Sequence, residues 1–136
     1  MKIYKMIPAA IGCFFVLLIL FSISEDLTGV NHSIFYAPGL KTDRDSLDWG
    51  ILNPGSFRTR TVKITNNFYT PITLEVFISK WTPGNASDFI LVTWNYNGSI
   101  IKPRESYNLI LALSVSLQIQ NITDFTFQTN VIPKNI

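Results

Sequence analysis

The chain has 136 residues, of which 47% are hydrophobic and 15% charged, and its formal net charge is +2. This length allows one domain of ordinary size but not two, and the hydrophobic fraction excludes an intrinsically disordered protein. Eleven basic residues less Lys2 and Lys5 leave nine after Glu25, against nine acidic ones, so the body of the protein is neutral. A neutral body without basic runs excludes an electrostatic surface for nucleic acid.

The first 24 residues contain an uncharged run of 17 residues, Ile7 to Ile23, which follows Lys2 and Lys5. Its length lies between the apolar core of a secretory leader and that of a full membrane-spanning helix. We predict that residues 1–24 form one hydrophobic helix that stays as a signal-anchor, with a cleaved signal peptide as the alternative. The two lysines place the N-terminus in the cytoplasm and the rest of the chain outside, in a single-pass membrane protein or, after cleavage, a secreted one.

Residues 25–45 show no sustained helical or strand periodicity and contain several turn-forming residues, which predicts a stalk or linker. His32, the only histidine, falls in this segment, so we expect a solvated loop residue rather than a catalytic base. The only cysteine, Cys13, lies in the hydrophobic run, so the body cannot form an internal disulfide.

Residues 46–136 change to period-two alternation, which is typical of strands with one buried face. The first predicted strand buries Leu47, Trp49 and Ile51 and ends at a turn, Asn53-Pro54-Gly55. Two further strands follow, one at residues 57–65 with Val62 and Ile64 inside, and one whose inward residues are Ile72, Leu74, Val76 and Ile78. The next strand is predicted at residues 89–96, with Val92 and Trp94 inside, and ends at the turn Asn97-Gly98. The last three are a short strand at residues 99–101, a strand with Leu109, Leu111, Leu113 and Val115 at alternate positions, and a strand with Phe125, Phe127 and Val131.

About seven short strands with turns between them, and no helix-period segment, predict an all-β domain at residues 46–136. The favoured fold is a single immunoglobulin-like β-sandwich, and a small barrel is the alternative. The expected core combines alternating residues of several strands. These are Trp49, Val62, Leu74, Val76, Leu111, Leu113 and Phe127.

Four short motifs occur in order: Leu47-Asp48-Trp49-Gly50, Asn53-Pro54-Gly55, Val62-Lys63-Ile64-Thr65-Asn66-Asn67 and Pro71-Ile72-Thr73-Leu74. This succession resembles the opening of Hydin-type and major-sperm-protein-like immunoglobulin-like domains. The resemblance implies a β-sandwich that is used for protein contacts. The chain also resembles cell-surface sandwich proteins of archaea, in Trp81, Trp94 and the Thr- and Asn-rich later strands.

Three acidic residues, Asp43, Asp45 and Asp48, precede the first predicted strand with the spacing Asp-x-Asp-x-x-Asp. Three carboxylates close together can hold a hard cation such as Ca²⁺. An EF-type loop would have Gly at its sixth position and Glu at its twelfth, where this chain has Asp48 and Pro54. A solvated acidic segment, partly neutralised by Arg44, is therefore the favoured interpretation, and no cofactor is predicted.

Glycosidase-type catalysis would need two carboxylates on either side of a substrate. The four acidic residues after Asp48 are each explained by a solvent-facing strand position or by a turn. They are Glu75, Asp88, Glu105 and Asp124. We therefore predict that the protein is not an enzyme.

Four Asn-x-Ser/Thr sequons, at Asn31, Asn85, Asn97 and Asn121, fall in the predicted stalk or loops, as expected for acceptor sites on an external surface.

A different set of residues predicts a partner surface. Phe68 and Tyr69 lie in a loop, and Phe77 and Trp81 share the outward parity of the strand after it, so the four can form an exposed aromatic patch. Ordinary packing of the same rings is the alternative.

The leader, stalk and sandwich together favour a membrane-anchored or secreted extracytoplasmic module with a structural or protein-interaction role at the cell surface. Its expected partners are the membrane, through the N-terminal segment, and an envelope protein or a second copy. The alternative is a filament subunit in which the segment from Ile34 to Tyr36 adds as a strand to a neighbour's sheet after leader cleavage. A secreted hydrolase with paired carboxylates is the least favoured class.

Overall fold

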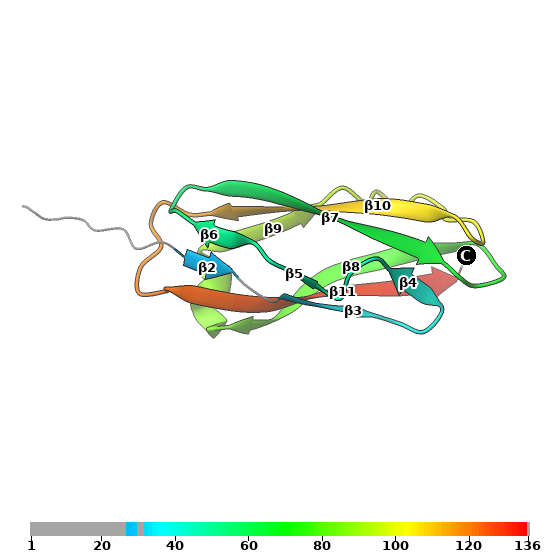
Figure 1. Ribbon diagram of the computed structural model, residues 1–136, viewed down its shortest axis with the longest axis horizontal. Coiled ribbons are helices and arrows are strands. Elements are labelled where there is room, and N and C mark those ends of the chain that lie inside the picture. The colour runs from blue at the N-terminus through cyan, green and yellow to red at the C-terminus, as the bar shows by residue number, and fades with distance from the viewer. Residues whose placement is uncertain (1–26, 30–31, 136) are drawn as a thin grey trace, which may run out of the picture.

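The computed structural model describes residues 27–29 and 32–135, which form two β-sheets around one hydrophobic core (Figure 1). This confirms the all-β, two-sheet prediction, while the predicted helix at residues 1–24 lies outside the described residues. The elements in chain order are β2 (Leu27–Gly29), β3 (His32–Tyr36), β4 (Leu40–Thr42), β5 (Ser46–Leu47), β6 (Gly50–Leu52), β7 (Phe57–Asn66), β8 (Ile72–Thr82), η3 (Gly84–Asp88), β9 (Ile90–Trp94), β10 (Ser106–Val115) and β11 (Asp124–Asn135).

The four-stranded sheet has the order β4-β7-β10-β9 and is antiparallel throughout. Its two central strands pair in unbroken register, with Val62 opposite Leu109. Val62, Ile64, Leu109, Leu111 and Leu113 are all buried, so the predicted alternation of β7 and β10 is confirmed.

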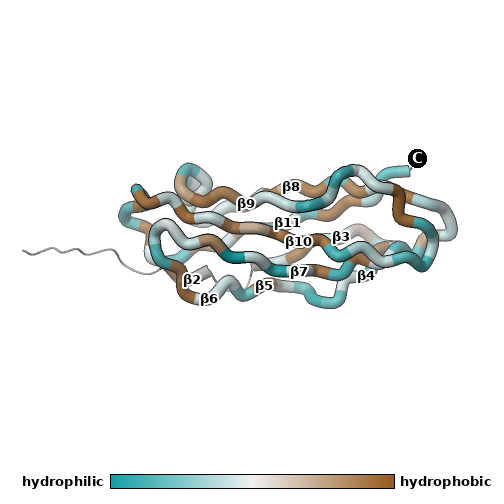
Figure 2. Tube along the Cα trace, turned by 90° about the horizontal axis from the view of Figure 1, so that it is seen from above, coloured by the Kyte–Doolittle hydropathy of each residue, from teal (hydrophilic) through white to brown (hydrophobic). Residues whose placement is uncertain are grey.

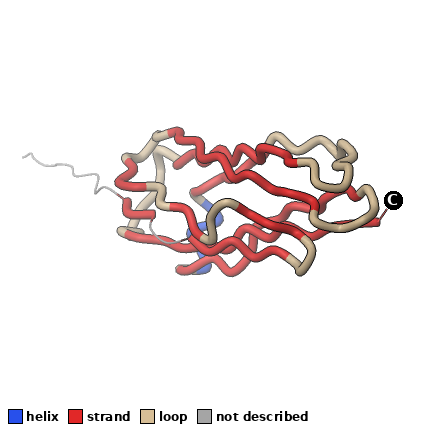
Figure 3. Tube along the Cα trace, turned by 45° about the vertical axis from the view of Figure 1, so that its right-hand side comes forward, coloured by secondary structure: helices blue, strands red, loops and turns tan. Residues whose placement is uncertain are grey.

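The six-stranded sheet is arranged around its last strand, β11. β8 pairs antiparallel with one side of β11, and β2 and β3 pair parallel with the other side. β6 then pairs with β2, and β5 pairs with β3, both antiparallel. Among the described residues, the only helical segment is η3, a 3₁₀ turn between β8 and β9 that is blue in Figure 3. In this part of the chain, no helix is long and apolar enough to cross a membrane.

The segment predicted as a stalk, residues 25–45, differs in the structure because it supplies strands to both sheets. β2 and β3 belong to the six-stranded sheet and β4 to the four-stranded one. Leu27, Ile34 and Leu40 are buried in the common core. Strands of three to five residues are too short to show a period-two pattern, so their apolar residues resemble isolated positions in a linker.

The first predicted strand is broken in two at Gly50, whose φ is +73°. The Asp48 carboxylate accepts a hydrogen bond from the Gly50 N–H at 2.8 Å and stabilises this bend. The bend shifts the alternation by one residue, so Leu52 is buried while Ile51 is 63% exposed. The prediction that Ile51 lies in the core was therefore wrong, because a non-extended glycine interrupts the strand.

The expected core residues share one cluster with buried residues of both sheets, as predicted. Figure 2 shows hydrophobic stretches on strands of both sheets, including β8 and β10. Trp94 is half-buried against this cluster. The short strand predicted at residues 99–101 is reduced to a single bridge between Ile101 and Ile72.

Candidate interaction surfaces

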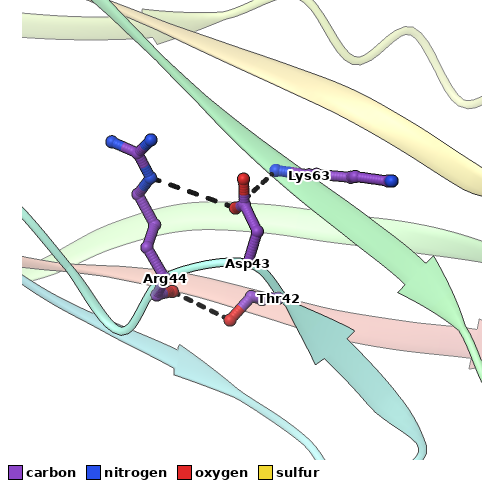
Figure 4. Close-up of polar contacts among 4 residues, drawn as sticks. All are labelled: Thr42, Asp43, Arg44 and Lys63. Carbon is purple, nitrogen blue, oxygen red and sulfur yellow. Dashed lines mark hydrogen bonds and ion pairs between the residues drawn. The ribbon is translucent and has the colours of Figure 1, made fainter.

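The three acidic residues before β6 each have a separate partner (Figure 4 for Asp43). Asp43 Oδ1 accepts a hydrogen bond from the Lys63 N–H at 3.0 Å and lies 4.0 Å from Arg44 Nε. The Tyr36 hydroxyl donates to Asp45 Oδ1 at 3.3 Å, and Asp48 accepts from the Gly50 N–H.

Within residues 27–29 and 32–135, no three His, Cys, Asp or Glu side chains lie close enough to hold a metal ion. The three carboxylates of Asp43, Asp45 and Asp48 therefore do not come together in one cluster. The physical reason is that the strands and the bend use each carboxylate locally, to hold a backbone N–H or a tyrosine hydroxyl.

The four acidic residues after Asp48 are all exposed, and they are Glu75, Asp88, Glu105 and Asp124. Glu105 Oε1 accepts a hydrogen bond from the Lys102 N–H at 2.8 Å and closes the turn before β10. Glu75 lies on β8 at a solvent-facing position, as its alternation predicted. The turn and strand roles expected for Glu105 and Glu75 are thus observed.

Three predicted sequon asparagines are exposed and lie outside the strands, while Asn31 lies outside the described residues. Asn85 is in η3, and Asn121 has a φ of +62° in the turn before β11. Asn97 Oδ1 accepts a hydrogen bond from the N–H of Ser99, the third residue of its own sequon, at 3.1 Å. Glycosylation at these positions stays a prediction.

The predicted aromatic patch is not assembled. The half-buried Phe68 ring occupies the space where a side chain on Gly39 would lie, and Tyr69 is 89% exposed near the Arg104 guanidinium, 5.7 Å from its ring. Both precede β8, whereas Trp81 lies near the other end of this 11-residue strand. A strand of that length spans about 35 Å, so Phe68 and Tyr69 do not converge with Trp81.

Trp81 also turns toward the core instead of solvent, because β8 contains a bulge. Thr82 is opposite Thr126 and Ser79 is opposite Gln128, so β8 has one residue more than β11 between these pairs. Lys80, inside the bulge, has a φ of +58°. The extra residue reverses the parity of the strand, and the Trp81 ring lies 4.9 Å from that of Phe127.

Phe77 precedes the bulge and keeps its predicted outward position, with an exposed fraction of 41%. Its register partner on β11 is Asn130, and the partner of Asn130 on the other side is Phe35 of β3, which is 48% exposed. The three side chains therefore form one row across the outer face of the six-stranded sheet. We name this row, with its polar neighbours Ser79 and Gln128, the Phe35–Phe77 surface.

Asn130 lies between the two aromatic positions and is only 5% exposed. Its Nδ2 donates to Ser79 Oγ at 2.8 Å and to the Phe77 carbonyl at 3.2 Å. Its Oδ1 accepts from Gln128 Nε2 at 2.7 Å. The polar atoms at the centre of the surface therefore bond to one another, and the phenylalanine rings remain exposed.

Sequence reasoning found Phe77 but missed Phe35, because residues 25–45 were assigned to a stalk. The alternation in Ser33, Ile34 and Phe35 was the available signal, but it is too short to outweigh the neighbouring turn residues. The segment from Ile34 to Tyr36, which the filament hypothesis assigns to a neighbouring molecule, pairs with β11 of its own chain here.

No protein-family model matches the chain, and no curated protein is similar to it. The resemblance to Hydin-type and major-sperm-protein-like domains therefore stays a prediction.

Proposed function

We propose that this chain is an immunoglobulin-like β-sandwich module that binds a protein partner outside the cytoplasm. The module is either anchored in the membrane by residues 1–24 or secreted after their cleavage. The observation that carries the binding role is the Phe35–Phe77 surface. Interfaces combine a few large, exposed anchors with a polar rim; aromatic residues are enriched at interfaces, and a few residues contribute most of the binding energy.

The internal hydrogen bonds of this surface support its use in binding. A partner that covers Asn130 meets an amide that is already paired, because its Nδ2 donates to Ser79 and Phe77 and its Oδ1 accepts from Gln128. Exposed Ser33 and Glu75, on β3 and β8, supply a polar rim. The apolar area of Phe35 and Phe77 then contributes to affinity without the cost of desolvating an unpaired amide at Asn130, which lies between them.

The proposed location rests on the sequence. The uncharged run from Ile7 to Ile23 and the preceding lysines favour a domain outside the cytoplasm. The sequon residues Asn85, Asn97 and Asn121 are exposed, so a glycosylating enzyme outside the cytoplasm can reach them. The immunoglobulin-like assignment is supported by two sheets whose long strands β7, β8, β10 and β11 enclose the core.

The binding role is tested by crosslinking in intact cells with the full chain, comparing the unchanged protein with Phe35→Ser and Phe77→Ser. We expect each change to reduce the crosslinked partner about tenfold, since loss of an anchor residue that contributes about 1.4 kcal/mol lowers affinity tenfold. Ile51→Ser is the matched control, because Ile51 is also an exposed strand residue and lies away from the surface.

Thermal melting of each variant shows whether the domain is still folded. Unchanged crosslinks in folded Phe35→Ser and Phe77→Ser variants would contradict the proposed surface. The location has its own readout: protease added to intact cells should cleave after Glu25, and complete protection there would contradict an external domain.

A further inference from the structure

β9 forms one edge of the four-stranded sheet, and no other described strand pairs with its free side. On the β10 side, the Ser116 N–H donates to the Phe89 carbonyl at 2.8 Å, and the Asn95 N–H donates to the Ile110 carbonyl at 3.2 Å. In an antiparallel ladder, alternate residues direct their backbone groups to opposite sides. Residues 89, 91, 93 and 95 therefore face β10, and the N–H and C=O groups of Ile90, Val92 and Trp94 face the free edge.

This edge lacks the features that usually prevent strands from pairing with another molecule. Edge strands are commonly protected by lysine, proline or a bulge. β9 has the sequence Ile-Leu-Val-Thr-Trp and pairs with β10 without a register shift. It presents uncharged, β-branched and aromatic residues, which favour strand pairing.

β8, at an edge of the other sheet, provides the contrast. It contains Lys80 in a bulge and is followed by Pro83. Part of its free side is already occupied, because Ile72 exchanges hydrogen bonds with Ile101, and the Leu74 N–H donates to the Tyr96 hydroxyl at 2.9 Å. Protection is thus present at the β8 edge and missing from β9.

We propose that β9 is a self-association site, at which β9 of a second copy pairs antiparallel with it around a twofold axis at Val92. In this register Val92 is opposite Val92 of the second copy, and Ile90 is opposite Trp94 of the second copy. These are the three residues whose backbone groups face the free edge. The pairing therefore satisfies about six backbone hydrogen bonds and joins the two four-stranded sheets into one.

The side chains of β9 and its lack of charge also favour a second copy of this chain as the partner. Leu91 is 62% exposed, and the register places Thr93 of the second copy directly opposite it. No charged residue lies within β9, so the twofold axis brings no like charges together. Leu91 also continues a row that crosses Ser114 to the exposed Phe57 on β7, which extends the apolar area beside the new contact. The site is independent of the Phe35–Phe77 surface, which lies on the other sheet.

A disulfide between two differently tagged full-length chains tests the register. Both chains carry Cys13→Ser, one carries Leu91→Cys and the other Thr93→Cys, and they are co-expressed in membranes and oxidised. Residues 91 and 93 would face each other at a non-hydrogen-bonded position, with Cα atoms about 4.5 Å apart, which suits a disulfide. We expect the mixed dimer to exceed both same-residue dimers, whose cysteines would be about 8 Å apart.

Thr59→Cys with Thr61→Cys is the matched control, because both threonines are exposed on the same sheet face but belong to the central strand β7. We expect this control pair to show only collisional crosslinking. A mixed 91–93 dimer no more abundant than the control, or no more abundant than the same-residue dimers, would overturn the proposal.

A charge at the edge tests the energetics in a chain without the cysteine pair. Leu91→Lys places two lysines near the twofold axis, and we expect it to raise the dimer dissociation constant about tenfold. Ile51→Lys is the control, with an exposed fraction of 63% against 62% for Leu91. An unchanged dissociation constant for folded Leu91→Lys would also overturn the proposal. If melting shows that Leu91→Lys is unfolded, Thr93→Lys is used as the charged variant instead.

Discussion

The two sheets differ in how they are built, although they share one core. The four-stranded sheet consists mainly of long strands that pair antiparallel without interruption. The six-stranded sheet places β11 between a bulged β8 and the short parallel strands β2 and β3. Regular alternation is enough to predict the two central strands of the first sheet, β7 and β10, whereas the second sheet depends on contacts between segments far apart in the chain.

Their buried residues differ in the same way. The core face of β10 is formed by leucines and valine, Leu109, Leu111, Leu113 and Val115, all buried. β11 instead has two adjacent buried polar residues, Thr129 and Asn130, at 1% and 5% exposure. Asn130 has several hydrogen-bond partners, but Thr129 Oγ1 has none within the described residues. Apolar packing thus dominates β10, whereas polar satisfaction varies along β11. The first sheet also buries a polar residue, Asn66 at the end of β7, but its amide donates to the Thr70 and Ile101 carbonyls and accepts from the Phe68 N–H.

The largest expected effect is in the four-stranded sheet. Leu111→Ala removes a fully buried side chain from the middle of β10 and should lower the free energy of unfolding by about 2 to 5 kcal/mol, measured by denaturant unfolding. Ile110→Ala, on the outward face of the same strand, is the control and should cost much less. Equal melting of the Leu111→Ala and unchanged proteins would refute the placement of β10 in the core.

A smaller loss is expected when the polar network of β11 is broken. Asn130→Ala removes the hydrogen bonds to Ser79 and Phe77 and leaves the Gln128 amide without its acceptor. The free energy of unfolding should fall by about 1 to 3 kcal/mol. Lys134→Ala, at an exposed position near the end of β11, should leave it within about 0.5 kcal/mol. A cost for Asn130→Ala no larger than for Lys134→Ala would show that the network does not stabilise the sheet.

The smallest effect has the opposite sign. Thr129→Val keeps the shape of a buried side chain and removes a hydroxyl that lacks a partner, so stability should rise by about 1 kcal/mol. Thr126→Val, on the exposed side of the same strand, controls for the change in β propensity. Thermal melting compares the two, and a lower melting temperature for Thr129→Val than for Thr126→Val would disprove the argument.

Local sequence is enough to predict the long strands and most of the core. In β7 and β10, hydrophobic residues recur at every second position over enough length that only one face can be buried. The turns at Asn53-Pro54-Gly55 and Asn97-Gly98 are likewise local, because glycine accepts the positive φ that Gly55 and Gly98 adopt. The outward position of Phe77 follows from the same periodicity.

Other positions depend on a single residue that breaks the pattern or on a distant partner, and these follow only from how the strands pair in the folded chain. Because of the bend at Gly50, Leu52 lies in the core and Ile51 does not, and the bulge at Lys80 turns Trp81 inward. A strand side chain changes faces with every one-residue shift, and whether such a shift occurs depends on the neighbouring strand. Phe35 lies in the same row as Phe77 only because β3 pairs with β11, a long-range contact that the five residues of β3 cannot specify by themselves.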